Sequence, residues 1–178
     1  MEPTKQVILV NEKDEMIGTM DKLDAHRAPY LHRAFSVFIF NSQGELLLQQ
    51  RNPSKYHSGG LWTNACCSHP GPGEETKLAA EKRLLEEMGF STPIEEIFQF
   101  TYSHEFENGL YEHEYDHVFI GVYNGVIKPD PEEVSDYRYD SLETIMTSLK
   151  ADPSQYTPWF LIAFPRIQDW FQKTTAKL

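Results

Sequence analysis

Residues 62–90 read WTNACCSHPGPGEETKLAAEKRLLEEMGF, and this stretch carries the most informative pattern in the 178-residue chain. It places the thiol of Cys67 two residues before His69, between an aromatic residue and a proline. Such a thiol can donate a proton, act as a nucleophile or bind a metal, and it is an unusual choice for packing alone. Residues 76–88 are expected to form a helix that carries carboxylates and ends at Gly89. A Cys-x-His turn that leads into an acidic helix points to an enzyme handling a metal-bound anion.

The composition is that of an ordinary soluble domain, with 40% apolar and 24% charged residues. The length suits one domain spanning residues 1–178. No apolar run approaches a membrane span, and no apolar segment follows the N-terminus as in a signal peptide. The formal net charge of −11 argues against nucleic acid as a partner. The two cysteines are adjacent and such pairs rarely bridge, so we expect no disulfide and a cytoplasmic location.

Alternating and apolar runs predict a series of β-strands. They cover residues 7–10, 34–40, 45–50, a segment around 98–102, and 111–123. The polar turn at 41–44 closes a hairpin, and Asn108-Gly109 supplies a tight turn before the last strand. Helical patterns are interspersed with these strands. The expected fold is therefore α/β (α+β), with a central mixed β-sheet flanked by helices.

Three helices are expected, each marked by different signals. The helix over residues 76–88 has Leu78, Ala79, Leu85 and Met88 near one face. Asp140 and Glu143 resemble a capping box for a helix that reaches about residue 150. Thr157 followed by Pro158 marks the start of a C-terminal helix. The apolar stripe of that helix consists of Phe160, Leu161, Phe164, Ile167 and Phe171.

The predicted strand over residues 111–123 groups acidic side chains. Successive side chains of a strand point to opposite faces, so one face carries Glu112, Glu114 and Asp116. Like charges on one face repel each other. The pattern fits either an exposed edge of the sheet or a metal site in which a divalent cation relieves the repulsion. Histidines can complete such a site, and the residues alone leave open which of the seven take part.

Few basic side chains are available to bind an anion. Arg51 and Lys55 lie just beyond a predicted strand end, and Lys22 is a third candidate. Arginine offers bidentate contacts to phosphate and lysine a point charge. The C-terminal half of the 76–88 helix adds Arg83 and two glutamates. These charges either form a solvated face or, because they follow a Gly/Pro-rich loop, hold a metal–diphosphate complex.

Residues 68–90 resemble a Nudix box, the loop–helix motif of enzymes that act on diphosphates. With Gly89-Phe90 as its end, the motif has Ser68 in place of its glycine and Lys82-Arg83 in place of its Arg-Glu pair. The two following glutamates stay in place. Ordinary Nudix hydrolases use the full set of carboxylates to bind the magnesium that assists hydrolysis. The missing pair therefore argues against hydrolysis.

A narrower resemblance explains these departures. The chain resembles the type I isopentenyl-diphosphate isomerase family over nearly its whole length. The matching segments are residues 21–26, 31–36, 51–55, 62–70, Tyr102, 112–114 and 156–159. The combination of Thr-Asn-x-x-Cys-x-His-Pro with a later Glu-x-Glu is highly specific to that family.

The resemblance implies a set of site residues. It implies a metal site for Mn²⁺, Mg²⁺ or Zn²⁺ made by His26, His32, His69, Glu112 and Glu114. It implies Cys67 and Glu114 as the two acid/base groups, with Tyr102 beside the glutamate and Trp159 facing the hydrocarbon. The implied diphosphate contacts are Lys22, Arg51, Lys55 and Arg83, and Glu87 would help hold a Mg²⁺ that bridges the diphosphate oxygens. Cys66 has no such role and is expected to be a small packing residue.

The implied reaction interconverts isopentenyl and dimethylallyl diphosphate, so the implied partner is a small prenyl diphosphate. A proton is added at the terminal alkene carbon and another is removed from C2, through a carbocation-like intermediate. One alternative is a diphosphate hydrolase on the same scaffold, which would need the full set of box carboxylates and no Cys67. A second is a non-catalytic binding module with Cys66, Cys67 and His69 as structural zinc ligands. Structural zinc usually takes four Cys or His ligands, and no second cysteine pair is present.

Overall fold

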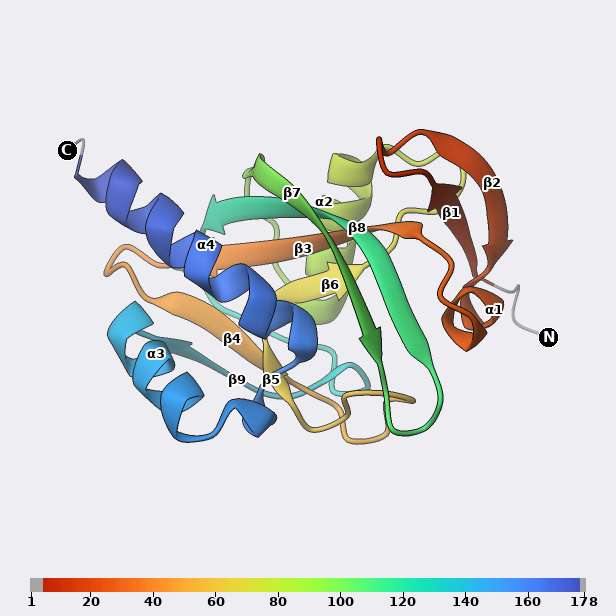
Figure 1. The fold of residues 1–178 in the computed structure, drawn as a ribbon. Coiled ribbons are helices and arrows are strands. Elements are labelled where there is room, and N and C mark those ends of the chain that lie inside the picture. Colours follow the sequence, from red (N-terminus) through yellow and green to blue (C-terminus); the bar gives the residue numbers. More distant parts are fainter. Residues whose placement is uncertain (1–4, 177–178) are drawn as a thin grey trace.

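The computed structural model describes residues 5–176 (Figure 1). Its strands are β1 (Gln6–Val10), β2 (Met16–Asp21), β3 (His32–Phe40), β4 (Leu46–Arg51), β5 (Trp62–Thr63), β6 (Cys66–Ser68), β7 (Ile94–Glu105), β8 (Tyr111–Val122) and β9 (Val134–Asp140). Its helices are α1 (Lys22–Arg27), α2 (Thr76–Met88), α3 (Leu142–Ala151), the short 3-10 helix η1 (Pro153–Gln155) and α4 (Pro158–Thr175). None of the helices within residues 5–176 has the length and apolar character needed to cross a bilayer.

Strand β3 is the centre of a mixed nine-stranded sheet. One edge of β3 pairs in parallel with β8 over nine residues, from His32 opposite Glu114 to Phe40 opposite Val122. Its other edge pairs antiparallel with three short partners in turn, namely β1, β6 and β4. The sheet is extended by β7 beyond β8 and by β9 beside β4. Residues far apart in the sequence therefore meet along β3.

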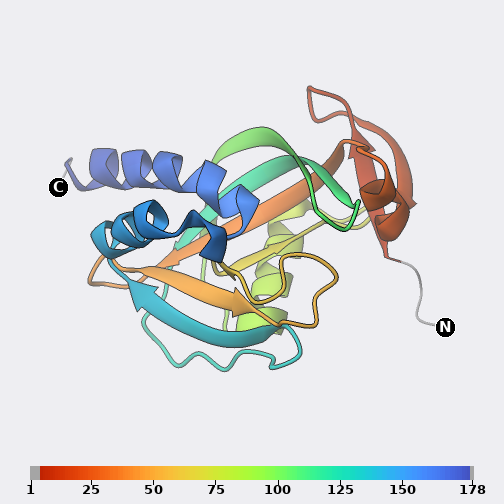
Figure 2. The same cartoon turned by 60° about the horizontal axis from the view of Figure 1, so that its bottom comes forward.

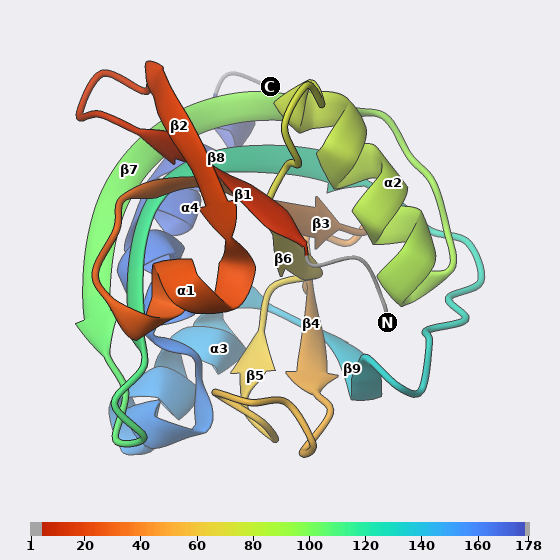
Figure 3. The ribbon, with the colours of Figure 1, turned by 90° about the vertical axis from the view of Figure 1, so that its right-hand side faces the viewer.

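Helices cover both faces of the sheet, as Figures 2 and 3 show. Helix α2 lies on one face, over a core that includes Val37, Ile39 and Phe119. Helices α3 and α4 lie on the other face, over a second core that includes Phe38 and Val118. The hairpin β1–β2 and helix α1 stand at the end of the sheet where β3 begins. This arrangement confirms the expected mixed sheet flanked by helices.

The face of β3 and β8 that is turned toward α4 changes character along its length. Phe38, Phe40, Val118 and Ile120 form its apolar half under the helix. At the other end of the same alternating rows lie the polar residues of β3 and β8, namely His32, Ser36, Glu112, Glu114 and Asp116, all buried. Buried carboxylates and a buried histidine are costly unless they have a role. Their position at this end of the rows therefore indicates a functional site here.

Helix α2 has the predicted bounds and ends at Gly89, whose φ of 74° is left-handed. The predicted face is wrong in part, because Leu78 and Leu85 are 61% and 51% exposed. The helix instead buries small Ala80 together with Leu84 and Met88. This 4-residue spacing lets the helix approach the sheet closely, and it turns the two other leucines to the surface.

The other two helices also start near their predicted positions. The cap of α3 is Ser141, whose side chain accepts the Thr144 N–H, and not Asp140, which is the last residue of β9. Thr157 precedes α4 as predicted, with Pro158 at the first helical turn. Its hydroxyl donates to Thr63 Oγ1 at 2.9 Å, so it ties the helix start to β5. The expected apolar stripe of α4 is confirmed for the buried Phe160, Phe164 and Ile167.

Gly89 generates the first prediction. A Cβ at this position would lie 2.1 Å from the Lys128 carbonyl oxygen, and the backbone is already left-handed. We expect Gly89→Ala to lower the free energy of unfolding by about 2–4 kcal/mol, measured by denaturant titration. The matched control is Gly109→Ala, since Gly109 has a φ of 78° but nothing within 4 Å. Its loss should be only about 1 kcal/mol, from backbone strain alone. Equal losses would show that residue 128 moves aside at little cost.

Candidate active site

Strand register brings three site residues into one row. His32 lies opposite Glu114 in the β3–β8 pair, and Tyr102 lies opposite the same glutamate in the β7–β8 pair. Residues opposite each other in neighbouring strands direct their side chains to the same face. The row therefore sets an imidazole, a carboxylate and a phenol side by side at the polar end of the sheet.

Three histidines and one glutamate form a compact cluster. One potential ligand atom from each of His26, His32, His69 and Glu114 lies within 4.8 Å of those of the others. They come from α1, β3, the end of β6 and β8. Helix α1 is held in place by Asp21, whose carboxylate accepts the N–H groups of Leu23 and Asp24. The expected ligands are thus brought together, except Glu112.

Two of these histidines are oriented by backbone carbonyls. His26 Nδ1 lies 2.8 Å from the Tyr111 oxygen, and His32 Nδ1 lies 2.8 Å from the Tyr30 oxygen. A carbonyl only accepts, so each Nδ1 carries the proton and each Nε2 presents a lone pair. Both Nε2 atoms are buried and lack a hydrogen-bond partner. Buried acceptors without partners are costly, and they fit a metal ion placed among them.

The electrostatics of the cluster suit metal ligation. Burial lowers the pKa of His69 to about 3 and also lowers the pKa of His26. At His32 burial opposes the charged form, but the Glu114 carboxylate outweighs it and raises the pKa. At Glu114 burial is likewise outweighed by His32 and His69, which hold the pKa well below its usual range. Neutral imidazoles at His26 and His69 beside an ionised Glu114 resemble a usual donor set for divalent metals.

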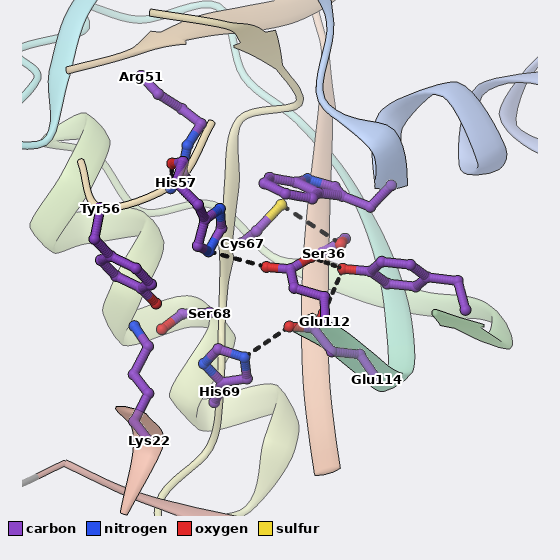
Figure 4. A pocket seen from close by; sticks show the side chains of 12 residues that line it. Lys22, Ser36, Arg51, Tyr56, His57, Cys67, Ser68, His69, Glu112 and Glu114 are labelled. Carbon is purple, nitrogen blue, oxygen red and sulfur yellow. Dashed lines mark hydrogen bonds and ion pairs between the residues drawn. The ribbon is translucent and has the colours of Figure 1, made fainter. Parts of the chain in front are cut away.

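Glu112 lies beside this cluster and is held by other groups. The Tyr102 hydroxyl lies 2.5 Å from Glu112 Oε2 and 2.7 Å from Glu114 Oε2, so it bridges the two carboxylates. Burial, and then the two glutamates, raise the pKa of Tyr102 well above its usual value. The other oxygen of Glu112 lies 3.1 Å from His57 Nε2 (Figure 4). No sequence signal had placed His57 in the site.

The two adjacent cysteines occupy opposite faces of β6. Cys66 pairs with Val37 and is fully buried in the core under α2, which confirms its packing role. Cys67 pairs with Ser36 and faces the polar end of β3 and β8. Because alternate residues of a strand point in opposite directions, the two thiols cannot share a metal ion. The structural-zinc alternative therefore does not fit.

The surroundings of Cys67 hold it as a thiol. The Asn64 side-chain nitrogen donates to two backbone carbonyls, so its oxygen faces the sulfur at 3.2 Å. An amide oxygen accepts only, and the S–H group must therefore donate to it. Burial, and next the charge of Asp116, raise the pKa of Cys67. Cys67 is thus kept protonated.

Ser36 links Cys67 to a second buried acid. The Ser36 hydroxyl donates to Asp116 Oδ2 at 2.7 Å and lies 3.5 Å from the Cys67 sulfur. Asp116 is 1% exposed, and its other oxygen has no partner. Burial, and then Glu114, raise the pKa of Asp116 well above its usual range. In the sequence, only strand alternation indicated that Asp116 faces the site. The polar residue Ser36 in an otherwise apolar strand was a further signal that a polar group lies against that face.

A small cavity of about 50 Å³ connects these groups (Figure 4). Cys67, Glu112, Glu114, Tyr102 and Trp159 line it together with the cations of Lys22 and Arg51. Trp159 is 3% exposed and stands at the start of α4. Burial lowers the pKa of Lys22 to about 8. Within residues 5–176 neither cation forms an ion pair with a carboxylate, so both are available to an anion.

The other expected anion contacts lie outside this cavity. Lys55 and Arg83 both form ion pairs with Glu133, and Arg83 also pairs with Glu87 at 2.9 Å. Burial raises the pKa of Glu87, which also accepts from Gln49. Arg83 lines a second cavity of about 460 Å³ beside α2. The two cavities share Ser68 and His69 as lining residues.

Comparisons with known proteins agree with this geometry. A model of the NUDIX domain matches residues 30–160. Similar curated proteins include the isopentenyl-diphosphate Delta-isomerase of Pectobacterium atrosepticum, 50% identical over 96% of this chain and 95% of that protein. The enzyme of the same name from Serratia proteamaculans is 46% identical over 88% of each chain.

Solved structures show the same fold at lower identity. DR0079 from Deinococcus radiodurans superposes with a TM-score of 0.70 at 22% identity, over 83% of this chain and 90% of that one. A MutT protein from Methanosarcina mazei gives 0.64 at 22% identity, over 82% and 95%. The similarity to the two isomerases thus covers 96% and 88% of this chain. The chain belongs to the isopentenyl-diphosphate Delta-isomerase family and has the Nudix fold.

Proposed function

We propose that this chain interconverts isopentenyl diphosphate and dimethylallyl diphosphate. The observation that carries this proposal is the cavity itself, in which a protonated thiol, Cys67, and a second acid/base group, Glu114, accompany a buried indole. The direct test is conversion of isopentenyl diphosphate to its isomer by the purified protein with a divalent metal. Release of phosphate without isomerisation would instead favour a hydrolase.

The reaction needs two proton carriers and no redox partner. One proton is added to C4 and one is removed from C2, so the double bond moves from C3–C4 to C2–C3 and the diphosphate is unchanged. We assign these transfers to Cys67 on β6 and Glu114 on β8. Because the reaction is reversible, each group acts as acid in one direction and as base in the other. Tyr102 contacts Glu114 and is placed to relay its proton.

The carbocation-like intermediate has to be stabilised and kept from water. The face of an indole attracts a cation by about 2 kcal/mol or more when the site is desolvated. Trp159 supplies such a ring, buried in the wall of the cavity, so we assign it to the hydrocarbon. Lys22 and Arg51 would bind the diphosphate in the small cavity, and Lys55 and Arg83 would supply further contacts.

The donor set fits a divalent metal. His26, His32, His69 and Glu114 would hold it, and Glu112 is next in line. Imidazole-rich sites suit Mn²⁺ or Zn²⁺ better than Mg²⁺, which prefers oxygen ligands. A bound divalent ion would supply positive charge that offsets the repulsion between the two glutamates, and Glu114 would be oriented as its ligand. We assign Mg²⁺ instead to the diphosphate, with Glu87 as its protein ligand.

A hydrolase on this scaffold is supported less well. Lys82-Arg83 replaces the Arg-Glu pair of the box. Glu74 accepts the Gly71 N–H at 2.7 Å within its own loop.

We further propose a single domain over residues 1–178 and a cytoplasmic location. Both cysteines are free, which suits a reducing compartment.

The thiol assignment is tested by a pair of neighbouring variants. We expect Cys67→Ser to lower kcat by about 10²–10⁴-fold, because a hydroxyl is a far weaker acid than a thiol. Metal content and folding should be unchanged. Cys66→Ser, which changes a side chain in the core, should have only a small effect on kcat. An inactive Cys66→Ser with an active Cys67→Ser would reverse the assignment.

The metal assignment is tested by metal analysis after dialysis. Removing a group that hydrogen-bonds to a metal ligand costs about 10–100-fold in metal affinity, and removing a ligand itself should cost at least as much. We therefore expect His69→Ala to weaken metal binding by at least this factor, and activity should fall with metal content. His104→Ala is the control, since His104 is not part of the cluster. Full metal occupancy in the His69 variant would exclude it as a ligand.

Lys22 predicts a pH dependence. Its pKa in the free protein is lowered to about 8 by burial. Below this pH the ammonium is charged and binds the diphosphate; above it the charge is lost. We expect kcat/KM to fall by about tenfold as the pH rises through 8. Lys22→Arg stays charged and should abolish the fall. The same fall in the arginine variant would assign it to another group.

A further inference from the structure

His57 is a buried side chain that the proposed mechanism does not use. It lies in the loop of residues 52–61, directly beyond Arg51, and is 8% exposed. Its ring lines the small cavity together with Cys67 and Glu114. Histidine is amphipathic and is seldom buried without a partner. Its burial beside the reacting groups therefore calls for a reason.

The ring of His57 is held on several sides. It stacks on Phe106 with centroids 4.5 Å apart and planes 19° apart, and it meets Tyr56 at 4.6 Å edge to face. It stands perpendicular to Trp159 at 6.0 Å. The Tyr56 carbonyl also accepts from Asn108 at 2.9 Å, which ties the loop to the β7–β8 turn. A ring fixed by this packing has one orientation.

The ring nitrogens have distinct partners. Nδ1 lies 3.2 Å from the Ser58 hydroxyl, which can donate to it, and Nε2 lies 3.1 Å from Glu112 Oε1. A carboxylate only accepts, so Nε2 carries the proton and the neutral ring suffices as donor. Ser58 has a φ of 53°, an uncommon value for a residue with a side chain. Such an outlier supports a functional reason for this local geometry.

The contact with His57 means that both carboxylate oxygens of Glu112 are held. His57 holds one carboxylate oxygen and the Tyr102 hydroxyl contacts the other at 2.5 Å. Tyr102 in turn contacts Glu114 at 2.7 Å. Since Glu112 is fixed at both oxygens, its plane is fixed, and with it the place of the Tyr102 hydroxyl beside Glu114.

We propose that His57 is a positioning residue, which orients Glu112 and through it the Tyr102–Glu114 pair. Arg51, the last residue of β4 before this loop, donates from its guanidinium to the His57 carbonyl at 3.3 Å. The loop that receives the diphosphate is thereby joined to the strand that carries the acid/base group. The proposal rests on the proposed isomerase function and adds a residue to it.

The test compares two side chains of equal length. His57→Met removes the donor, whereas His57→Gln offers an amide N–H to Glu112. We expect the methionine variant to lose about 10–100-fold in kcat with KM changed less than about threefold, as for a lost hydrogen bond to a charged group. The glutamine variant should recover most of that loss. His104→Met is the control, because His104 packs against the same Phe106 ring at 4.7 Å but is not hydrogen-bonded to Glu112.

A second measurement separates this proposal from the proposed function. A double-mutant cycle with His57→Met and Glu112→Met, read by the free energy of unfolding of the metal-loaded protein, should be non-additive. Parental kcat in His57→Met, equal rates for the glutamine and methionine variants, or an additive cycle would each overturn the positioning role. A parent protein without isomerase activity would overturn the proposed function, while the cycle would still report the contact.

Discussion

The parallel pairing of β3 with β8 is the interaction on which the site depends. Its register sets His32 opposite Glu114, and β7 then sets Tyr102 opposite the same glutamate. A shift of one residue would turn every side chain of a strand to the other face. Such a shift is opposed at the far end of the same strands, where Phe38 and Val118 are buried under α4. The core that stabilises the fold thus also fixes the geometry of the chemistry.

Much of the frame could be predicted because its signals are local. The bounds of α2 and the shared face of Glu112, Glu114 and Asp116 follow from periodicity within one segment. The face of α2 could not be predicted in full, since only the sheet beneath decides whether Leu84 or Leu85 is buried. The cap at Ser141 depended likewise on where β9 ends.

The site divides in the same way. The clustered histidines were predicted through the family resemblance, because the residues alone left open which histidines take part. His57 and Ser36 were missed because their contacts join segments far apart in the sequence: residue 57 meets 112, and residue 36 meets both 67 and 116. A cross-strand or loop contact of this kind has no counterpart in a local pattern.

Glu133 is an internal counter-ion in the region proposed to bind the diphosphate. In the protein alone, its carboxylate already occupies Lys55 and Arg83. A ligand that reaches these two cations has to exchange with that carboxylate, so its affinity there is a difference between two anions. By contrast Lys22 and Arg51 present charge that no described carboxylate neutralises. The proposed region therefore contains two kinds of cation. Lys22 and Arg51 would bind an anion directly, whereas at Lys55 and Arg83 an anion would compete with Glu133, which would favour ligands bearing more charge than one carboxylate.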